Sequence, residues 1–249
     1  MHIQPEDSPV EIRDITLDWA CLALWGPKAR HVLQKITQDD VSNESFPYLQ
    51  AKTVDINGVG VWAQRVSYVG ELGWELYVPS NRAVAVWDAL MRDGKEFGIE
   101  VGGYKVLDSL RLEKGYRYFT TDVTPLETPY ESGLGFCVRL NKGDFIGKEA
   151  LVQKKQEGLK RILCTLVLDG NEFTQIYGGE ALHHRGKIIT RVRSGGYGYT
   201  LKKNIFYAYL PFELATAGTR VEVELIEGRY QGEVTTAVLF DSKGERLRV

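Results

Sequence analysis

The sequence contains few of the residues that build metal centres and disulfide frameworks. It has 3 cysteines and 4 histidines in 249 residues. Cys21, Cys137 and Cys164 are widely separated, and none lies in a CxxC pattern or a histidine-rich segment, so we expect reduced, mostly buried thiols. His183 and His184 are adjacent, and on a strand they would point to opposite faces. We therefore predict no metal site.

Long apolar runs and an excess of one charge are also missing. The 31 basic and 33 acidic residues give a net charge of −2, without a basic run that could follow a phosphate backbone. No stretch approaches the ~18 apolar residues of a membrane span, and residues 1–10 include Pro, Glu and Asp where a signal peptide needs an apolar core. We expect a cytoplasmic protein that binds neither nucleic acid nor membrane.

The first part of the chain carries both strand and helix signals. Asn57-Gly58, between two β-type runs, is a strong hairpin signal, and we expect the second strand of this hairpin to continue to Tyr68. A helix capped by Ser80 should bury Ala83, Val84, Trp87, Leu90 and Met91. Other strands are expected at 21–24 and 74–78, and other helices at 28–36, 103–114 (with Val106, Leu107 and Leu110 inward) and 147–156.

Beyond residue 160 the pattern changes to short β-type runs separated by turn residues. These runs cover 162–168, 187–192, 205–210, 221–226 and 232–239. Runs of this length and spacing are typical of a small barrel or sandwich. We predict an α+β protein in which a mixed sheet with covering helices, in a domain of residues 1–158, is followed by a C-terminal β-barrel domain of residues 159–249.

Glycine-rich segments stand out where common catalytic signatures are absent. The chain has no phosphate loop, GxSxG elbow, HExxH motif or dinucleotide fingerprint. Instead, residues 67–76 read SYVGELGWEL, residues 107–117 read LDSLRLEKGYR, residues 130–136 read YESGLGF and residues 142–151 read KGDFIGKEAL. Each segment alone is a weak signal, but their order and spacing together are specific.

These segments closely resemble the folate-binding aminomethyltransferase family, which includes the glycine-cleavage T-protein and the C-terminal tetrahydrofolate domain of dimethylglycine and sarcosine dehydrogenases. The family pattern is a Tyr–x–Gly–Glu–x–Gly–x–Glu hairpin, an Asp–Ser–Leu–Arg–Leu–Glu helix and a Gly–Leu–Gly–Phe strand. Trp74 and the end of the second segment are more similar to the dehydrogenase tails. The resemblance covers essentially the whole chain.

The resemblance implies two cofactor-binding residues, Tyr68 and Glu75, which match the family's contacts with the pterin ring of tetrahydrofolate. A carboxylate can accept the two adjacent N–H donors of a pterin edge. Gly70 and Gly73 would let the chain turn tightly between the two side chains. From the residues alone, a surface carboxylate and a cross-strand aromatic would be the simpler interpretation.

Other motif residues are better interpreted as scaffold. Glu71 is expected in a turn, solvated or bound to local N–H groups, and Asp108 should pair with Arg111 one helical turn away. Asp122 and Glu131 could line a folate cavity. Residues 116–118 could guide the glutamate tail of a folate, although a solvated loop is the simpler interpretation.

The chain departs from the family pattern in two places. Leu107 replaces an arginine that contacts folate in glycine-cleavage T-proteins. The family's catalytic aspartate lies well upstream of the hairpin, and only 67 residues precede Tyr68, so no catalytic residue is assigned here.

Three functions follow from this pattern. The first is a C-terminal portion of a transferase that forms 5,10-methylenetetrahydrofolate from an aminomethyl or iminium donor, completed by an N-terminal partner segment or an FAD-containing oxidoreductase subunit. The second is a non-catalytic folate-binding or regulatory module of an oxidoreductase complex. The third is a structural domain docked on a flavin oxidoreductase.

Overall fold

The computed structural model describes residues 11–235 and 238–249, which divide into two compact units. Unit 1 contains the chain up to Ser67, then Glu71–Val101 and Glu245–Val249. Unit 2 contains Tyr68–Gly70 and Gly102–Gly244. The chain thus passes between the units more than once, and each unit is described by itself.

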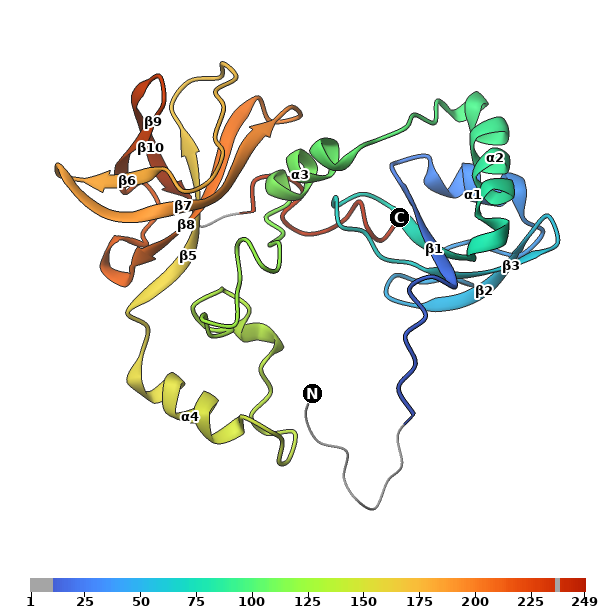
Figure 1. The fold of residues 1–249 in the computed structure, drawn as a ribbon, viewed down its shortest axis with the longest axis horizontal. Helices are drawn as coiled ribbons and strands as arrows, with labels where there is room; N and C mark the ends of the chain where they lie inside the picture. Colours follow the sequence, from blue (N-terminus) through green and yellow to red (C-terminus); the bar gives the residue numbers. More distant parts are fainter. Residues whose placement is uncertain (1–10, 236–237) are drawn as a thin grey trace. The chain divides into compact units, whose positions relative to one another are not determined.

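Unit 1 is a four-stranded antiparallel sheet with helices on one face (Figure 1). The strand order is β1-β4-β3-β2. Apolar residues from the strands and from both helices form one buried cluster. The elements are β1 (Trp19–Trp25), α1 (Ala29–Ile36), β2 (Ala51–Ile56), β3 (Val59–Gln64), β4 (Gly73–Pro79), α2 (Ala83–Gly94) and the 3-10 helices η1 (Ser80–Arg82) and η2 (Lys95–Phe97).

The hairpin between β2 and β3 confirms the turn prediction. Asn57 and Gly58 both have positive φ, 51° and 78°, as a type I′ turn requires. The predicted continuation of the second strand to Tyr68 is wrong, because β3 ends at Gln64. Past this point the backbone of Arg65 is still hydrogen-bonded to Leu49 and Gln50, outside the strands.

Helix α2 buries Leu90 as predicted, but the other predicted residues are half-buried or exposed. Val86, Ala89 and Leu90 are buried, whereas Val84 and Trp87 are exposed. Val84 lies nearly opposite the buried stripe on a helix of 3.6 residues per turn. Ser80 does not cap this helix either: its hydroxyl donates to the carbonyl of Leu17, and η1 precedes the helix.

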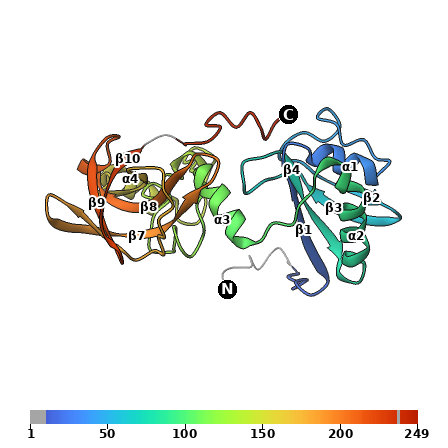
Figure 2. The same ribbon diagram turned by 90° about the horizontal axis from the view of Figure 1, so that it is seen from above.

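Unit 2 combines two helices with a closed six-stranded barrel of order β10-β5-β8-β7-β6-β9. Closure leaves no unpaired sheet edge. Helix α3 contacts β7 and β8, as Figure 2 shows. The elements are α3 (Tyr104–Glu113), α4 (Lys148–Glu157), β5 (Arg161–Leu168), β6 (Ala181–His184), β7 (Lys187–Gly198), β8 (Lys203–Pro211), β9 (Arg220–Leu225), β10 (Gly228–Thr235) and the 3-10 helices η3 (Gly135–Cys137) and η4 (Phe212–Leu214).

The predicted fold class is confirmed, with local corrections in unit 2. Strand β6 was not predicted, and β10 begins at Gly228, before the predicted 232–239 run, of which residues 236 and 237 lie outside the described chain. In α3, Val106 is exposed and Leu107 and Leu110 are only half-buried. The predicted domain boundary near 158–160 falls just before β5 and stays a prediction.

The described residues contain no helix long and apolar enough to cross a membrane.

Candidate functional site

Glu75 lies in the middle of β4, on the face of the sheet that points away from the helices. Strand residues alternate between faces, and Trp74, Leu76 and Val78 are fully buried in the core. Glu75 and Tyr77 are only half-buried on the opposite side. The alternation therefore brings a carboxylate and a phenol together outside the core.

The strands beside β4 complete this outer face of the sheet. Register pairs Tyr77 with Cys21 in β1 and with Trp62 in β3. The rings of Trp62 and Tyr77 lie 5.4 Å apart between centroids. The Tyr77 hydroxyl donates to Oε2 of Glu75 at 3.0 Å. The outer face of the sheet is defined here by Cys21, Ala23, Trp62, Gln64, Glu75 and Tyr77.

Desolvation changes the acidity of two groups on this face. It raises the pKa of the Tyr77 phenol to about 12, and the hydrogen bond with Glu75 adds to the rise. Cys21 is exposed, but partial desolvation by its neighbours raises the pKa of its thiol, and the Glu75 carboxylate acts in the same direction. Both groups therefore carry their protons near neutral pH and can donate hydrogen bonds.

Both glycines predicted to let the chain turn tightly, Gly70 and Gly73, have positive φ, and each lies close against another part of the chain. A Cβ on Gly73 would overlap the carbonyl oxygen of Leu24 in the neighbouring strand β1. Gly70 has φ of 78° and lies against the side chain of Lys114 in unit 2. Gly73 thus permits the β1–β4 pairing that places Glu75 on the outer face.

Tyr68 belongs to unit 2, whereas Glu75 belongs to unit 1. The Tyr68 ring stacks on Tyr116 with centroids 5.9 Å apart, and its hydroxyl donates to the carbonyl of Arg117 at 2.7 Å. Burial raises the pKa of the Tyr68 phenol to about 12. Its environment is thus a half-buried aromatic pair, and the folate-binding roles of both Tyr68 and Glu75 stay predictions.

The side chain of Asp122 has a structural role, because other residues hold both of its carboxylate oxygens. Its Oδ2 lies 2.5 Å from Nη1 of Arg111 and also accepts the backbone N–H of Tyr118. Its Oδ1 accepts the hydroxyl of Ser194. The side chain is completely buried. The predicted pair of Arg111 with Asp108 is present at 3.2 Å, so one guanidinium binds both carboxylates.

Glu131 and Glu127 connect the 124–131 loop to the barrel. Glu131 accepts from Thr128 and from Nε of Arg161 at 3.0 Å. Glu127 accepts from Arg193 at 2.6 Å and lies 3.4 Å from Arg161. Sequence reasoning missed Glu127, Arg161 and Arg193, because partners 34 and 66 positions apart leave no local pattern.

Three other predicted features need correction. Glu71 is neither simply solvated nor bound only to local N–H groups, since it forms a 2.5 Å ion pair with Arg246. Residues 135–137 form η3 in place of a strand. Of the cysteines, only Cys164 is buried, whereas Cys21 and Cys137 are exposed and belong to none of the buried apolar clusters. All three thiols are free.

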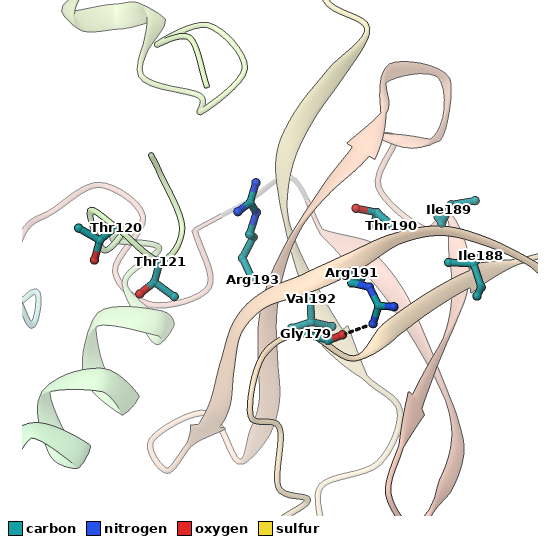
Figure 3. A pocket seen from close by; sticks show the side chains of 9 residues that line it. All are labelled: Thr120, Thr121, Gly179, Ile188, Ile189, Thr190, Arg191, Val192 and Arg193. Atoms are coloured by element: carbon teal, nitrogen blue, oxygen red, sulfur yellow. Dashed lines mark hydrogen bonds between the residues drawn. The ribbon is translucent and has the colours of Figure 1, made fainter. Parts of the chain in front are cut away.

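A cavity of about 760 Å³ lies in unit 2 beside β7 (Figure 3). Threonine and arginine side chains line it together with isoleucines, and one guanidinium, that of Arg191, donates to the carbonyl of Gly179. Asp122, Glu131 and Tyr68 are not part of its lining. The lining residues are Thr120, Thr121, Gly179, Ile188, Ile189, Thr190, Arg191, Val192 and Arg193.

The histidines of β6 contact different groups. His183 lies 2.9 Å from Glu224, and His184 lies 2.9 Å from the carbonyl of Arg220. Within the part of the chain that the structure describes, no group of three His, Cys, Asp or Glu side chains could hold a metal ion.

The chain is similar in sequence to a known dehydrogenase and to a known aminomethyltransferase. The chain is 40% identical over 241 residues to human dimethylglycine dehydrogenase, mitochondrial, covering 96% of this chain and 28% of that protein. It is 39% identical over 214 residues to an aminomethyltransferase of Caldanaerobacter subterraneus subsp. tengcongensis, covering 86% of this chain and 56% of that one. The chain therefore spans between about a quarter and a little over half the length of these relatives.

A solved structure agrees in fold. The glycine cleavage system aminomethyltransferase T from Bartonella henselae superposes with a TM-score of 0.79 at 27% identity, covering 90% of this chain and 60% of that chain. Residues 1–142 match the GCVT N-terminal domain, and residues 161–241 match the glycine cleavage T-protein C-terminal barrel domain. The chain therefore belongs to the glycine cleavage T-protein family.

Proposed function

We propose that the chain is the tetrahydrofolate-binding portion of an aminomethyltransferase and that Glu75 holds the pterin ring. The observation that carries the proposal is the half-buried Glu75 carboxylate on the outer face of the sheet. Among the described residues, its Oε2 accepts the Tyr77 hydroxyl and its Oε1 has no hydrogen-bond partner. A carboxylate with an oxygen that has no partner can accept hydrogen bonds from a ligand whose N–H donors lie side by side.

The surroundings of Glu75 also fit a flat heterocycle. Trp62 and Tyr77 provide aromatic surface on the same face, and Trp62 is 44% exposed. Aromatic side chains combine apolar contact area with a polar group at one end. A pterin hydrogen-bonded to Glu75 would therefore also find apolar partners.

In this proposal tetrahydrofolate supplies N5, the nitrogen that accepts the one-carbon unit. The chain's own contribution is orientation: a charge-assisted pair of hydrogen bonds at Glu75 fixes the plane and direction of the ring. In the same proposal the chain is part of a larger transferase or dimethylglycine or sarcosine dehydrogenase-like protein, and the one-carbon unit comes from an aminomethyl or iminium donor.

A non-catalytic folate-binding module is the second candidate function. Asp122, Glu127 and Glu131 are each held by an arginine of unit 2. None of these three carboxylates is therefore available in this arrangement to support a cationic one-carbon donor.

The test is titration of tetrahydrofolate into the parent chain, Glu75→Gln and Glu100→Gln. Gln presents an NH2 group where the ligand needs an acceptor, and loss of one partner in a buried charged pair costs about 2–5 kcal/mol. We expect the dissociation constant of Glu75→Gln to rise roughly 30-fold or more. The matched control, Glu100→Gln, changes an exposed carboxylate of unit 1 and should bind like the parent. Absence of binding by the parent, or equal binding by all three, would refute the proposal.

A further inference from the structure

Tyr77 is the residue that fixes the carboxylate of Glu75. The two side chains lie two positions apart on one face of β4, so they are neighbours along the strand. The Tyr77 hydroxyl donates to Oε2 of Glu75 at 3.0 Å. This is the hydrogen bond that restrains the carboxylate on the outer face of the sheet.

Neighbouring strands hold the Tyr77 ring in turn. Trp62 of β3 packs on it at 5.4 Å, and Cys21 of β1 is its paired residue on the other side. The Cys21 thiol and the Tyr77 phenol also lie close enough for each to shift the pKa of the other. Contacts from both neighbouring strands therefore leave this phenol far less freedom than an exposed tyrosine has.

A glutamate on a strand needs such a restraint if it is to orient a ligand. The terminal torsion angle of a glutamate side chain has a broad, roughly two-fold distribution. Ordering a Glu side chain costs up to about 1.5–2 kcal/mol of rotamer entropy. When Tyr77 holds Oε2, the plane of the carboxylate is set before a ligand arrives. Oε2 can still accept a second hydrogen bond, and Oε1 can accept others. Both oxygens therefore remain able to bind a ligand.

The donor role of Tyr77 persists across the physiological range. Burial and the Glu75 hydrogen bond raise the pKa of the phenol to about 12. The hydroxyl therefore remains protonated near neutral pH, so it continues to donate to the carboxylate.

We propose that Tyr77 is a positioning residue: its hydroxyl presets the Glu75 carboxylate, held between Trp62 and Cys21, to receive the adjacent N–H donors of a pterin. This inference rests on the proposed folate binding. It assigns the Tyr77 hydroxyl no contact with the ligand, so the effect of removing that hydroxyl, with the ring kept in place, passes through Glu75.

The test is a double-mutant cycle in tetrahydrofolate affinity. Tyr77→Phe removes only the hydroxyl and should raise the dissociation constant about 5- to 20-fold, the range expected for losing one hydrogen bond to a charged group. In the Glu75→Gln background the same change should alter affinity less than about 2-fold. Tyr104→Phe, at a side chain that is 83% exposed, is the matched control, and thermal melts report whether each variant is folded. An equal loss in both backgrounds would overturn the positioning role while leaving folate binding intact.

A second readout needs no folate. With ¹³C-labelled tyrosine rings, the Tyr77 pKa should fall from about 12 toward its ordinary value in Glu75→Gln, whereas Glu100→Gln should leave it unchanged. An unchanged Tyr77 pKa in Glu75→Gln would overturn the hydrogen bond itself. If the Tyr77 pKa falls in Glu75→Gln but the parent chain binds no tetrahydrofolate, the folate proposal and the positioning role are both refuted. Only the hydrogen bond between Tyr77 and Glu75 would then stand.

Discussion

Arg111 and Asp122 form a buried ion pair in unit 2, with Nη1 and Oδ2 2.5 Å apart. Their side chains are 3% and 0% exposed. Asp122 also accepts the hydroxyl of Ser194 in β7 and the N–H of Tyr118. One carboxylate thereby joins helix α3, the loop that follows it and the barrel.

Asp122→Asn should strongly destabilise unit 2. The change leaves the buried Arg111 guanidinium without its main counter-charge, which typically costs about 3–5 kcal/mol. Asp108→Asn is the matched control, because Asp108 binds the same guanidinium but is 58% exposed, and such pairs contribute about 1 kcal/mol or less. Urea denaturation of the two variants measures the difference. Equal shifts in midpoint would show that burial is not what makes the Asp122 pair important.

Local signals in the sequence predicted much of the fold. The Asn57-Gly58 turn and the strand at 74–78 depend on neighbouring residues only, and both are present. The barrel was predicted from several short β-type runs at regular spacing. Strand β6 was missed because its four residues, ALHH, are too few to show an alternating pattern.

Features that depend on tertiary contacts could not be predicted from neighbouring residues in the sequence. The burial of Val86 in place of Val84 depends on where α2 lies on the sheet. The pairing of Glu71 with Arg246 joins residues 175 positions apart. The sequence singled out Glu75 through a family resemblance, and a strand at 74–78 puts Tyr77 on the same face, but the hydrogen bond between them is seen only in the structure.

Acid should weaken the attachment of the 124–131 loop to the barrel. Burial works to raise the pKa of Glu127 and Glu131, but hydrogen bonds from Thr124 and Thr128 and the nearby arginines outweigh it, so both pKa values lie below the ordinary 4.5. A carboxyl with a lowered folded pKa contributes stability that is complete above its unfolded pKa and lost as pH falls through the folded value. Stability should therefore fall as pH decreases below about 4.5.

Urea midpoints measured from pH 6 to pH 3 check this dependence. Glu127→Gln should reduce the slope of stability against pH in that window, because it removes one of the two carboxyls of the 124–131 loop whose pKa is lowered. Glu213→Gln, at an exposed position in the same unit, should leave the slope as it is. An identical slope in the parent and Glu127→Gln would contradict the predicted role of Glu127.

Alkylation should distinguish the three cysteines. Cys21 and Cys137 are exposed, whereas Cys164 is buried and burial raises the pKa of its thiol to about 11. Iodoacetamide at neutral pH should therefore modify two thiols in the folded chain and the third only in urea, as mass spectrometry can show. Rapid labelling of Cys164 in the folded chain would contradict its burial.

Cys21 should also respond to Glu75. Partial desolvation is the main cause that raises the pKa of the Cys21 thiol, and the negative charge of Glu75 is the next. Glu75→Gln removes this charge, so more thiolate should form near pH 8 and Cys21 should react faster, while the rate at Cys137 stays constant. Equal rates at Cys21 in the parent and the variant would contradict the electrostatic contact across β1 and β4.

Gly73→Ala should disrupt the sheet at the point where β4 begins. A Cβ on Gly73 would overlap the carbonyl oxygen of Leu24 and crowd Trp25, and φ of 158° is one that residues with a side chain rarely adopt. The backbone of β1 cannot move aside without losing its pairing with β4, so we expect a loss of about 2 kcal/mol or more in the stability of unit 1. Because Glu75 lies two residues further along β4, tetrahydrofolate affinity should fall as well.

The matched control is Gly60→Ala in β3 of the same sheet. A Cβ there would lie 3.7 Å from Cγ2 of Thr53, an ordinary contact, and alanine lowers the conformational entropy of the unfolded chain. Gly60→Ala should therefore be neutral or stabilising by up to about 1 kcal/mol. Urea denaturation and tetrahydrofolate titration of both variants give the comparison. If Gly73→Ala were as stable as Gly60→Ala, the close approach of β1 and β4 would not be what requires glycine. If Gly73→Ala lost stability but kept full affinity, the position of Glu75 would not depend on that approach.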